Sequence, residues 1–422
     1  MASEYSNPSE AEKTERVGLL HHDEALRRIL DTCTVVVEAE ALPVDHAFGR
    51  VLHDEVIAPR DVPPQDNSAM DGYAVRAASL PPSGSGLLRL TGRVLAGCPA
   101  AAAVGPGECM RIMTGAPIPD SADTVVIREQ ADETNGLVRI GPGHEPGANI
   151  RRRGEDIRIG DVVLARGRRL GPADLGLIAS LGLPVVRVFR RPRVALFSTG
   201  DELCNPGDSP RDGQIFDSNR YSLLGLLNEL GAEIRELGIL PDDPERIRSS
   251  LRESAHSADV VLSSGGVSMG DADHVTNVLT ELGQISFWRI AIKPGRPLAF
   301  GTLGPKTLFF GLPGNPVAAM VTFIRFVRPA LRRISGQAPV PTLTFEVPCL
   351  DSLRKAPGRT EFQRGILRRD ESGRLCVGVT GRQGSGILRS MSQADCLIVL
   401  GHDRGPVSAG EMVTVQPLPG WY

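Results

Sequence analysis

The chain has 422 residues, which is too long for one hydrophobic core and favours about two to four domains. Its net charge of -3 is too near balance to indicate a nucleic-acid or membrane surface. Aromatic residues make up 4%, which argues against a base-stacking platform. The 7 cysteines are scattered and contain no CxxC pair, so reduced thiols are expected rather than disulfides or a zinc site.

Residues 1–15 are polar and are expected to be frayed. The sequence has no apolar signal core and no run of about 18 apolar residues, so we expect a cytoplasmic protein. The 8 histidines show no metal-ligand spacing. His21-His22 is interpreted as a solvated helix start rather than as a pair of ligands.

Apolar runs separated by Gly/Pro-rich connections over 54–145 predict an inserted β-domain. Helical spacing of apolar residues predicts short helices over 22–31 and 171–183. Because both helices border the β module, residues 16–53 and 146–185 are assigned to one discontinuous connecting domain.

Two stretches within this β module combine many polar groups with little periodicity. Residues 63–75 and 111–117 are of this kind, and such stretches are more often functional loops than merely solvated ones. The charge run at 149–156 fits a substrate role and a solvated, salt-bridged face equally well.

Residues 186–335 alternate strand and helix patterns. Apolar runs at 193–197, 234–240 and 260–262 indicate buried strands, and Asp217 is placed to cap the helix that follows the first strand. Strands joined by crossover helices imply a parallel sheet with helices on both faces, which is a three-layer α/β domain. Ligands of such folds bind at the carboxyl ends of the strands.

The segment 263–273 follows one of these strands and precedes a helix. Its glycines let the backbone approach an anion, and successive N–H groups at a helix N-terminus attract phosphate. Asp271 implies a bound Mg²⁺, because the carboxylate would otherwise repel phosphate. The alternative is an ordinary glycine-rich turn, but the strand, the serines and Asp271 together favour a phosphate site.

Further segments are expected at the same edge of the sheet. Residues 197–202 end the first strand, and residues 214–219 precede a helix that they could simply cap. Lys293 and Arg296 lie on a proline-stiffened turn that is either an anion clamp or an exposed turn. Residues 311–316 again end a strand and open a helix, which makes a further N-terminus ready for an anion.

Residues 336–422 show alternating apolar and polar residues, such as Leu343, Phe345 and Val347, between glycine-rich turns. This pattern predicts a small β-barrel or sandwich.

Taken together, these segments resemble the molybdopterin molybdenumtransferase family, the bacterial relatives of the gephyrin E domain. The resemblance covers residues from about 20 to 420, and its segments run in the family's order. The matching segments are DNSAMDGYAVR at 66–76, RIMTGAPIP at 111–119, ADTVV at 122–126, NIRRRGEDI at 149–157, STGDEL at 198–203, DSNRY at 217–221, SSGGVSMGDAD at 263–273, KPGRPLAFG at 293–301 and GLPGNPV at 311–317.

The resemblance implies a connecting domain, a β-domain, a molybdopterin-binding α/β domain and a C-terminal β-barrel, with an active site shared between the protomers of a homodimer. It implies a transferase that inserts molybdate into adenylylated molybdopterin with Mg²⁺ and releases AMP. It further implies a molybdopterin adenylyltransferase upstream, apo-molybdoenzymes or their chaperones downstream, and no nucleic-acid or membrane partner.

The resemblance also implies roles for individual residues. Glu202, Asp217 and Asp271 would hold Mg²⁺ or orient water at the pyrophosphate bond, and Asp66 and Thr114 would reach this site from the other protomer. The implied substrate-binding residues are Thr199, Gly200, Ser218, Ser264, Gly265, Gly266, Ser268, Lys293, Arg296, Pro313, Pro316, Arg359 and Ser385.

The chain departs from the family pattern at four positions. Arg296 stands where many relatives have lysine, Ala318 where several have serine, Gln65 where an aromatic is frequent, and Cys98 where an acidic residue is common. None of these removes a carboxylate or the phosphate loop, so activity is expected. Two alternatives stay open: adenylylation of molybdopterin, which the extra β-domains disfavour, and a scaffold without catalysis, which the intact carboxylates disfavour.

Overall fold

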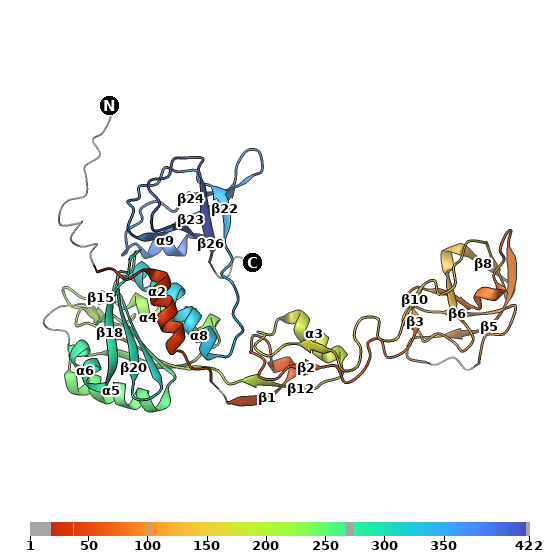
Figure 1. Cartoon of the computed structure of the whole chain (residues 1–422), viewed down its shortest axis with the longest axis horizontal. Coiled ribbons are helices and arrows are strands. Elements are labelled where there is room, and N and C mark those ends of the chain that lie inside the picture. Colours follow the sequence, from red (N-terminus) through yellow and green to blue (C-terminus); the bar gives the residue numbers. More distant parts are fainter. Residues whose placement is uncertain (1–17, 37, 99–101, 267–273, 419–422) are drawn as a thin grey trace. The chain divides into compact units, whose positions relative to one another are not determined.

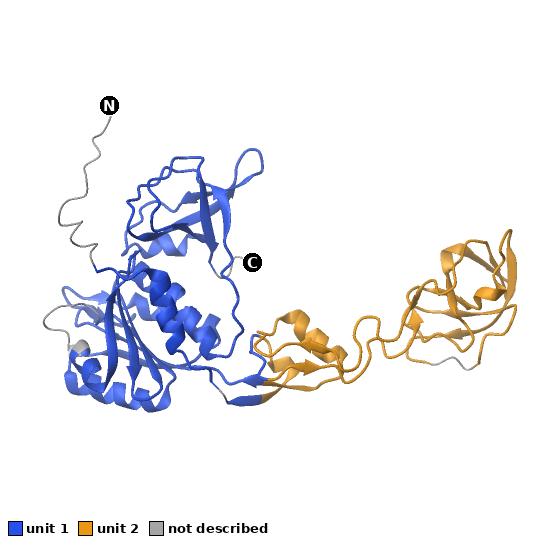
Figure 2. Ribbon diagram, in the orientation of Figure 1, with its two compact units in different colours: residues 1–40, 49–53, 188–422 blue, residues 41–48, 54–187 orange. Residues whose placement is uncertain are grey.

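A computed structural model describes residues 18–36, 38–98, 102–266 and 274–418. No helix in those ranges is long and apolar enough to cross a membrane. The chain divides into two compact units (Figure 2). Unit 1 holds Met1–Glu40, Gly49–His53 and Val188–Tyr422, and unit 2 holds Ala41–Phe48 and Asp54–Arg187. The finer division into four domains stays a prediction.

Unit 2 contains a six-stranded sheet in the order β7-β4-β6-β5-β9-β8. Its strands are β4 (Gly72–Val75), β5 (Gly86–Val94), β6 (Glu108–Ile112), β7 (Thr124–Ile127), β8 (Ala131–Thr134) and β9 (Leu137–Ile140). Apolar side chains cover both faces of β4, with Tyr73 and Val75 on one face and Ala74 on the other. The prediction of an uncommitted polar loop over 63–75 is therefore wrong for its last four residues, which form β4, a strand paired on both sides.

The rest of unit 2 consists of short elements. Helix α3 (Pro172–Ser180) confirms the helix predicted over 171–183. The other elements are η1 (Val44–His46), β2 (Val56–Ile57), β3 (Asn67–Ser68), η2 (Ala77–Ser79), η3 (Arg128–Gln130), β10 (Ile150–Arg151) and β11 (Val162–Leu164). Strands β1 (Ala39–Pro43) and β12 (Val185–Phe189) each contain a point where the chain passes between the units.

Unit 1 is built on a six-stranded sheet in the order β16-β13-β17-β21-β20-β18. Its strands are β13 (Arg193–Thr199), β16 (Glu233–Leu240), β17 (Val260–Ser264), β18 (Gly283–Arg289), β20 (Pro297–Leu303) and β21 (Thr307–Leu312). Strands β16, β13, β17 and β21 are parallel, whereas β20 runs antiparallel to its neighbours β21 and β18. The predicted parallel sheet is therefore mixed, because a short connection folds β20 back onto β21.

Helices cover both faces of this sheet (Figure 1). Side chains of α5 (Pro244–Ser257) and α6 (His274–Leu282) pack on one face. The other face carries α4 (Ser218–Glu229), α7 (Pro316–Thr322), the π-helix η4 (Phe323–Val327) and α8 (Arg328–Ile334). Helix α2 (His22–Thr32) joins this second layer through Ala25 and Ile29. We expected α2 to lie with α3 in a connecting domain; its apolar stripe is instead buried against the α/β core.

Local signals fix where these helices begin. Asp217 caps α4 by accepting a hydrogen bond from the backbone N–H of Arg220, and Asp243 caps α5 by accepting from Glu245 and Arg246. Proline is the first residue of α5 and of α7, where its missing N–H costs nothing. The predicted cap at Asp217 and the helix start predicted within residues 311–316 are confirmed.

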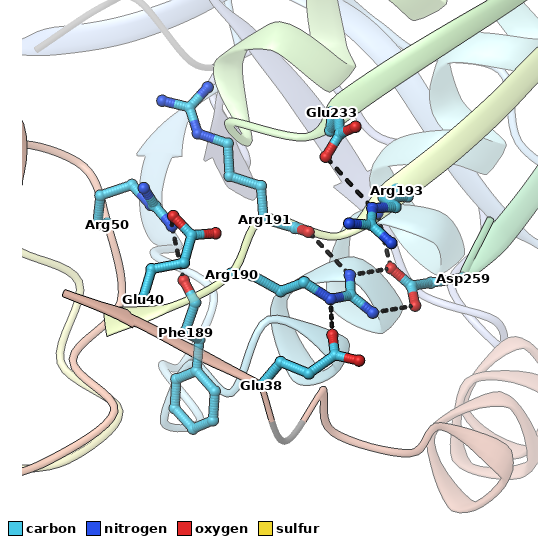
Figure 3. A network of polar contacts seen from close by, with 9 residues as sticks. All are labelled: Glu38, Glu40, Arg50, Phe189, Arg190, Arg191, Arg193, Glu233 and Asp259. Carbon is cyan, nitrogen blue, oxygen red and sulfur yellow. Dashed lines mark hydrogen bonds and ion pairs between the residues drawn. The ribbon is translucent and has the colours of Figure 1, made fainter. Parts of the chain in front are cut away.

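A polar network ties the amino ends of β13 and β17 to the segment that follows α2 (Figure 3). Arg190 donates two hydrogen bonds to Asp259, at 2.7 and 2.8 Å, and is also paired with Glu38. Asp259 accepts a third hydrogen bond from the backbone N–H of Arg193 at 2.7 Å. The network lies at the end of the sheet away from the carboxyl ends of the strands.

The C-terminal part of unit 1 holds a second six-stranded sheet, with the path β19-β23-β25-β26-β22 and with β24 paired to β23. Its elements are β19 (Ile292–Lys293), β22 (Phe345–Pro348), β23 (Thr360–Arg369), β24 (Leu375–Val379), α9 (Leu388–Ser392), β25 (Cys396–Leu400) and β26 (Met412–Pro417). The pairings are antiparallel except for β19 with β23. The alternating pattern therefore does form strands, and closure into a barrel stays a prediction.

Candidate active site

The carboxyl ends of three parallel strands meet at one edge of the α/β sheet. Ser264, the last residue of β17, pairs with Ser198 of β13 and with Leu312 of β21. The side-chain amide of Asn219, on the first turn of α4, donates to Ser264 Oγ and to the carbonyl oxygen of Gly314, both at 2.8 Å. The loops that follow β17 and β21 are thereby joined, as the shared-edge hypothesis predicts.

The loop after β17 has room for glycine alone. Gly265 has φ +86°, and an added Cβ would stand 2.8 Å from the carbonyl oxygen of Thr199. Gly266 has φ +67°, and its Cβ would stand 2.8 Å from Thr199 Oγ1. The backbone therefore turns tightly over the end of β13, as a phosphate cradle requires. Ser268 and Asp271 lie outside the described residues.

Several buried polar atoms at this edge lack a hydrogen-bond partner in the described part of the chain. They are Ser198 Oγ, Thr199 Oγ1 and Asn219 Oδ1. Buried polar groups are normally satisfied, so three such atoms at one sheet edge indicate a place where a polar ligand binds.

The predicted carboxylates differ in their surroundings. Glu202 is exposed, and its carboxylate lies over Gly200, where an added Cβ would be 2.4 Å from Oε2. Asp217 is only 1% exposed. Its oxygens accept hydrogen bonds from the backbone N–H and the Nε of Arg220, both at 3.1 Å. Asp217 is thus engaged as the cap of α4, with Ser218 as the first helical residue.

A second polar feature of unit 1 is a cavity of about 320 Å³ between the turn after β19 and the C-terminal sheet. Lys293, Arg354 and Arg364 supply positive charge to its lining, against the single carboxylate of Glu361. Lys293 Nζ stands 3.3 Å from both oxygens of Glu361. The lining keeps a net positive charge, which suits a small anion.

Arg364 is 1% exposed, and burial lowers its pKa to about 10. It stays protonated at neutral pH and is held by Ser390 Oγ at 2.9 Å and by the carbonyl oxygen of Gly384 at 3.1 Å. The neighbouring Ser385 accepts a hydrogen bond through its carbonyl oxygen from the backbone N–H of Val317. This contact holds the 380–387 loop against the first turn of α7.

The remaining predicted residues of unit 1 lie on these same loops. Arg296 follows the Lys293 turn, and its carbonyl oxygen accepts from the backbone N–H of Ile290. Pro313 and Pro316 flank the start of α7. Arg359 is half-buried and precedes β23.

Unit 2 places Asp66 and Thr114 on neighbouring segments, because Ser68 pairs through its backbone with Gly115 and Ala116. The Asp66 carboxylate accepts from the backbone N–H of Arg153 at 2.8 Å and from Arg152 Nη1 at 2.7 Å. These donors lower the pKa of Asp66. The charge run is therefore at least in part a salt-bridged face.

Thr114 is held by a residue that was not among the predicted site residues. The Asp71 carboxylate accepts from both the backbone N–H and the Oγ1 of Thr114, at 2.7 Å each, and these bonds lower the pKa of Asp71. Sequence reasoning also missed Asn219, Glu361 and Arg364. Asn219 lies inside a predicted segment, whereas Arg364 lies in a strand that also contains Glu361, Gln363 and Arg368, so no local signal marked it.

Three family models match the chain in order. They describe the MoeA N-terminal region (domain I and II) over residues 20–182, a probable molybdopterin binding domain over 195–333, and the MoeA C-terminal region (domain IV) over 346–418. The molybdopterin molybdenumtransferase of Haemophilus influenzae is 41% identical over 401 residues, which is 94% of this chain and 98% of that protein. The chain belongs to the molybdopterin molybdenumtransferase family.

Other relatives of this family agree over most of the chain. The molybdopterin molybdenumtransferase of Nostoc sp. is 36% identical and covers 90% of this chain and 89% of its own length. Gephyrin of Dictyostelium discoideum is 34% identical, and the match covers 93% of this chain and 61% of the length of that protein. The crystal structure of the molybdopterin biosynthesis moeA protein from Pyrococcus horikoshii OT3 superposes with a TM-score of 0.83 at 29% identity, covering 95% of this chain and 100% of that one.

Proposed function

We propose that this protein is a molybdopterin molybdenumtransferase, which inserts molybdate into adenylylated molybdopterin and releases AMP. Membership of the family supports the transferase and its place in molybdenum cofactor biosynthesis. The observation that carries the proposal is the shared strand edge, where glycine-only turns and unpartnered buried hydroxyls lie side by side.

The strand edge supplies the binding groups for the pyrophosphate and nucleotide. The tight turn at Gly265 and Gly266 lets the backbone approach the phosphate oxygens, and Ser264 and Thr199 add hydroxyl donors. Ser268 extends the same loop by sequence. Lys293, which lines the positively charged cavity, would attract the molybdate dianion, and Arg296, Arg359 and Ser385 would assist from the adjoining loops.

Some of the predicted carboxylates at the strand edge are suitable ligands for Mg²⁺. When bound, Mg²⁺ would neutralise negative charge on the pyrophosphate as its bond to AMP breaks. Glu202 and Asp271 are the proposed ligands, since the exposed carboxylate of Glu202 has no partner to displace among the described residues. Asp217 would have to leave Arg220 to bind the ion directly, so we assign it the positioning of α4 and of Asn219.

We further propose a homodimer in which Asp66 and Thr114 of one protomer complete the site of the other. The support is an apolar surface on unit 2, where the cross-strand pair Ile57 and Val162 is 49% and 55% exposed, and Ile159 is 63% exposed. Exposed apolar groups in contact commonly mark an interface. Cytoplasmic location, supply by a molybdopterin adenylyltransferase, and delivery to apo-molybdoenzymes or their chaperones belong to the same proposal.

The test is to incubate the protein with adenylylated molybdopterin, Mg²⁺ and molybdate. We expect stoichiometric release of AMP and a product that activates an apo-molybdoenzyme. Absence of AMP release would contradict molybdenum insertion. Consumption of ATP together with free molybdopterin would instead identify an adenylyltransferase.

A further inference from the structure

Three histidines from opposite ends of the chain meet in unit 1. His21 caps α2, His22 is its first residue, and His402 follows β25. The ring of His21 lies 4.8 Å from that of His22 and 5.0 Å from that of His402, measured between centroids. In the sequence, His21 and His22 are an isolated pair. His402 joins them only in the folded protein, because the C-terminal sheet packs beside α2.

A carboxylate completes this histidine cluster. Asp23 Oδ1 stands 3.0 Å from His22 Nδ1, and Asp23 Oδ2 stands 3.7 Å from His21 Nδ1. One donor atom each from His21, His22 and Asp23 fits within 4.8 Å, a spacing that could hold a metal ion.

Two of the rings carry buried nitrogens that form no hydrogen bond with the described residues, although His22 Nδ1 lies 3.0 Å from Asp23 Oδ1 as an ion pair. Nδ1 of His22 and Nδ1 of His402 are buried and have no hydrogen-bond partner among the described residues. The His22 side chain is 12% exposed, so the expectation of a solvated helix start is wrong for this residue. Orphaned imidazole nitrogens from two separate elements indicate a missing ligand, since buried polar groups are normally satisfied.

The cluster is held in place and suited to a cation. The carbonyl oxygen of His402 accepts hydrogen bonds from the backbone N–H of Gly358 and from Lys355 Nζ, which fix the loop. Arg325 is a nearby cation that opposes metal binding, and the Asp23 carboxylate offsets it.

We propose that His21, His22, Asp23 and His402 bind one divalent transition-metal ion that fastens α2 to the C-terminal sheet. Imidazole and carboxylate ligands suit Zn²⁺ and similar ions, whereas Mg²⁺ prefers oxygen ligands. None of the four residues lines the Lys293 cavity or belongs to the strand edge. The site is structural and separate from the proposed Mg²⁺ site.

The test is equilibrium binding of Zn²⁺ to the full chain, purified without a polyhistidine tag and stripped with a chelator. We expect one Zn²⁺ per chain, and a loss of affinity of at least about tenfold in each of His22→Gln and His402→Gln, as for removal of a group that supports a metal site. His256→Gln changes an exposed histidine of α5 and is the matched control, expected to bind as the parent does.

Equal affinity in His402→Gln and the parent would overturn the proposal, and so would an equal loss in His256→Gln. X-ray absorption of the Zn²⁺-loaded parent gives a readout that needs no variant. Three imidazole nitrogens around zinc are expected, and two or fewer would rule out the cluster as the site. Competition by Mg²⁺ at equal concentration would also contradict the imidazole ligand set.

Discussion

Gly265 shows how one missing Cβ shapes the proposed phosphate loop. Its positive φ is costly for other residues, and its Cβ would meet a backbone oxygen that cannot rotate away. The side chains at the same edge are less rigid than this backbone, because a hydroxyl such as that of Thr199 can rotate toward a ligand. The backbone of this loop is therefore the more rigid half of the binding surface.

We expect Gly265→Ala to destabilise the protein by about 1–3 kcal/mol more than Gly373→Ala, because overpacking adds to the backbone strain. Gly373 is a matched control, with φ +83° against +86° and no atom within 4 Å of its added Cβ. Denaturant unfolding of both variants measures the difference. Gly265→Ala should also weaken binding of adenylylated molybdopterin. Equal destabilisation of the two variants would mean that the loop after β17 can shift to accommodate the added Cβ.

Asp66 predicts a pH dependence. Its folded-state pKa lies below the usual 3.8, owing first to the backbone N–H of Arg153 and then to Arg152. The stabilisation is therefore fully present above the unfolded-state pKa and is lost as pH falls through the folded-state pKa. We expect Asp66→Asn to melt below the parent at pH 7, with the gap closing as the pH falls below 3.8. A gap that stays constant with pH would show that the charge plays no part.

Helix α4 carries a cap that is also a predicted metal ligand. Asparagine caps helices about as well as aspartate, so Asp217→Asn keeps the bond to the Arg220 backbone. Arg220 would retain Glu236 and Asn205 as partners. Because the carboxylate is engaged with Arg220, we expect the Mg²⁺ concentration for half-maximal AMP release to stay within about twofold of the parent.

Asp217→Ala is the companion variant, which loses the cap and should unfold more easily than Asp217→Asn, by about 1 kcal/mol. Thermal melting measures this difference. A Mg²⁺ requirement raised about tenfold in Asp217→Asn would instead identify Asp217 as a direct ligand.

The Arg190 network joins three elements at the amino ends of the strands (Figure 3). Asp259→Asn removes the charge that two guanidinium nitrogens and one backbone N–H share. We expect a loss of about 1–3 kcal/mol in the free energy of unfolding, because the largely buried Arg190 loses its main partner. Glu253→Gln breaks the exposed pair with Arg235 and is the control, expected to cost under about 1 kcal/mol. Equal losses would show that the network adds nothing beyond a surface pair.

For the whole molecule, the decisive question is whether the site is shared between protomers. Glu202→Ala impairs the unit 1 half of the proposed site, and Asp66→Ala impairs the unit 2 half. If each site combines unit 1 of one protomer with unit 2 of the other, a mixed dimer contains one intact site. We expect the two inactive variants to recover AMP release after they are mixed and allowed to exchange.

A site built within one chain would stay inactive in that mixture. Val162→Asp provides the control, because it places a charge on the exposed apolar surface of unit 2. We expect this variant to be monomeric by light scattering and to abolish the recovery. Recovery by a monomeric protein would contradict the shared site.

The sequence by itself determined the local features of this protein. Capping residues, prolines and apolar periods placed α3, α4, α5 and α7, because these signals act within a few residues. Glycines after a buried strand marked the phosphate loop for the same reason. The nine family segments added the domain types and the catalytic expectation.

Only the tertiary structure decided which distant segments meet. An apolar run has the same pattern in a parallel or an antiparallel pair, so the reversal of β20 between β21 and β18 left no local signal. The apolar stripe of α2 predicts that one face of the helix is buried, but it does not indicate which domain core the helix packs against. The same holds for the contacts of Asn219 and Arg364 and for the meeting of His21 with His402. These contacts join residues that are far apart in the chain. They form because they lower the free energy of the folded state, and no local sequence pattern indicates them.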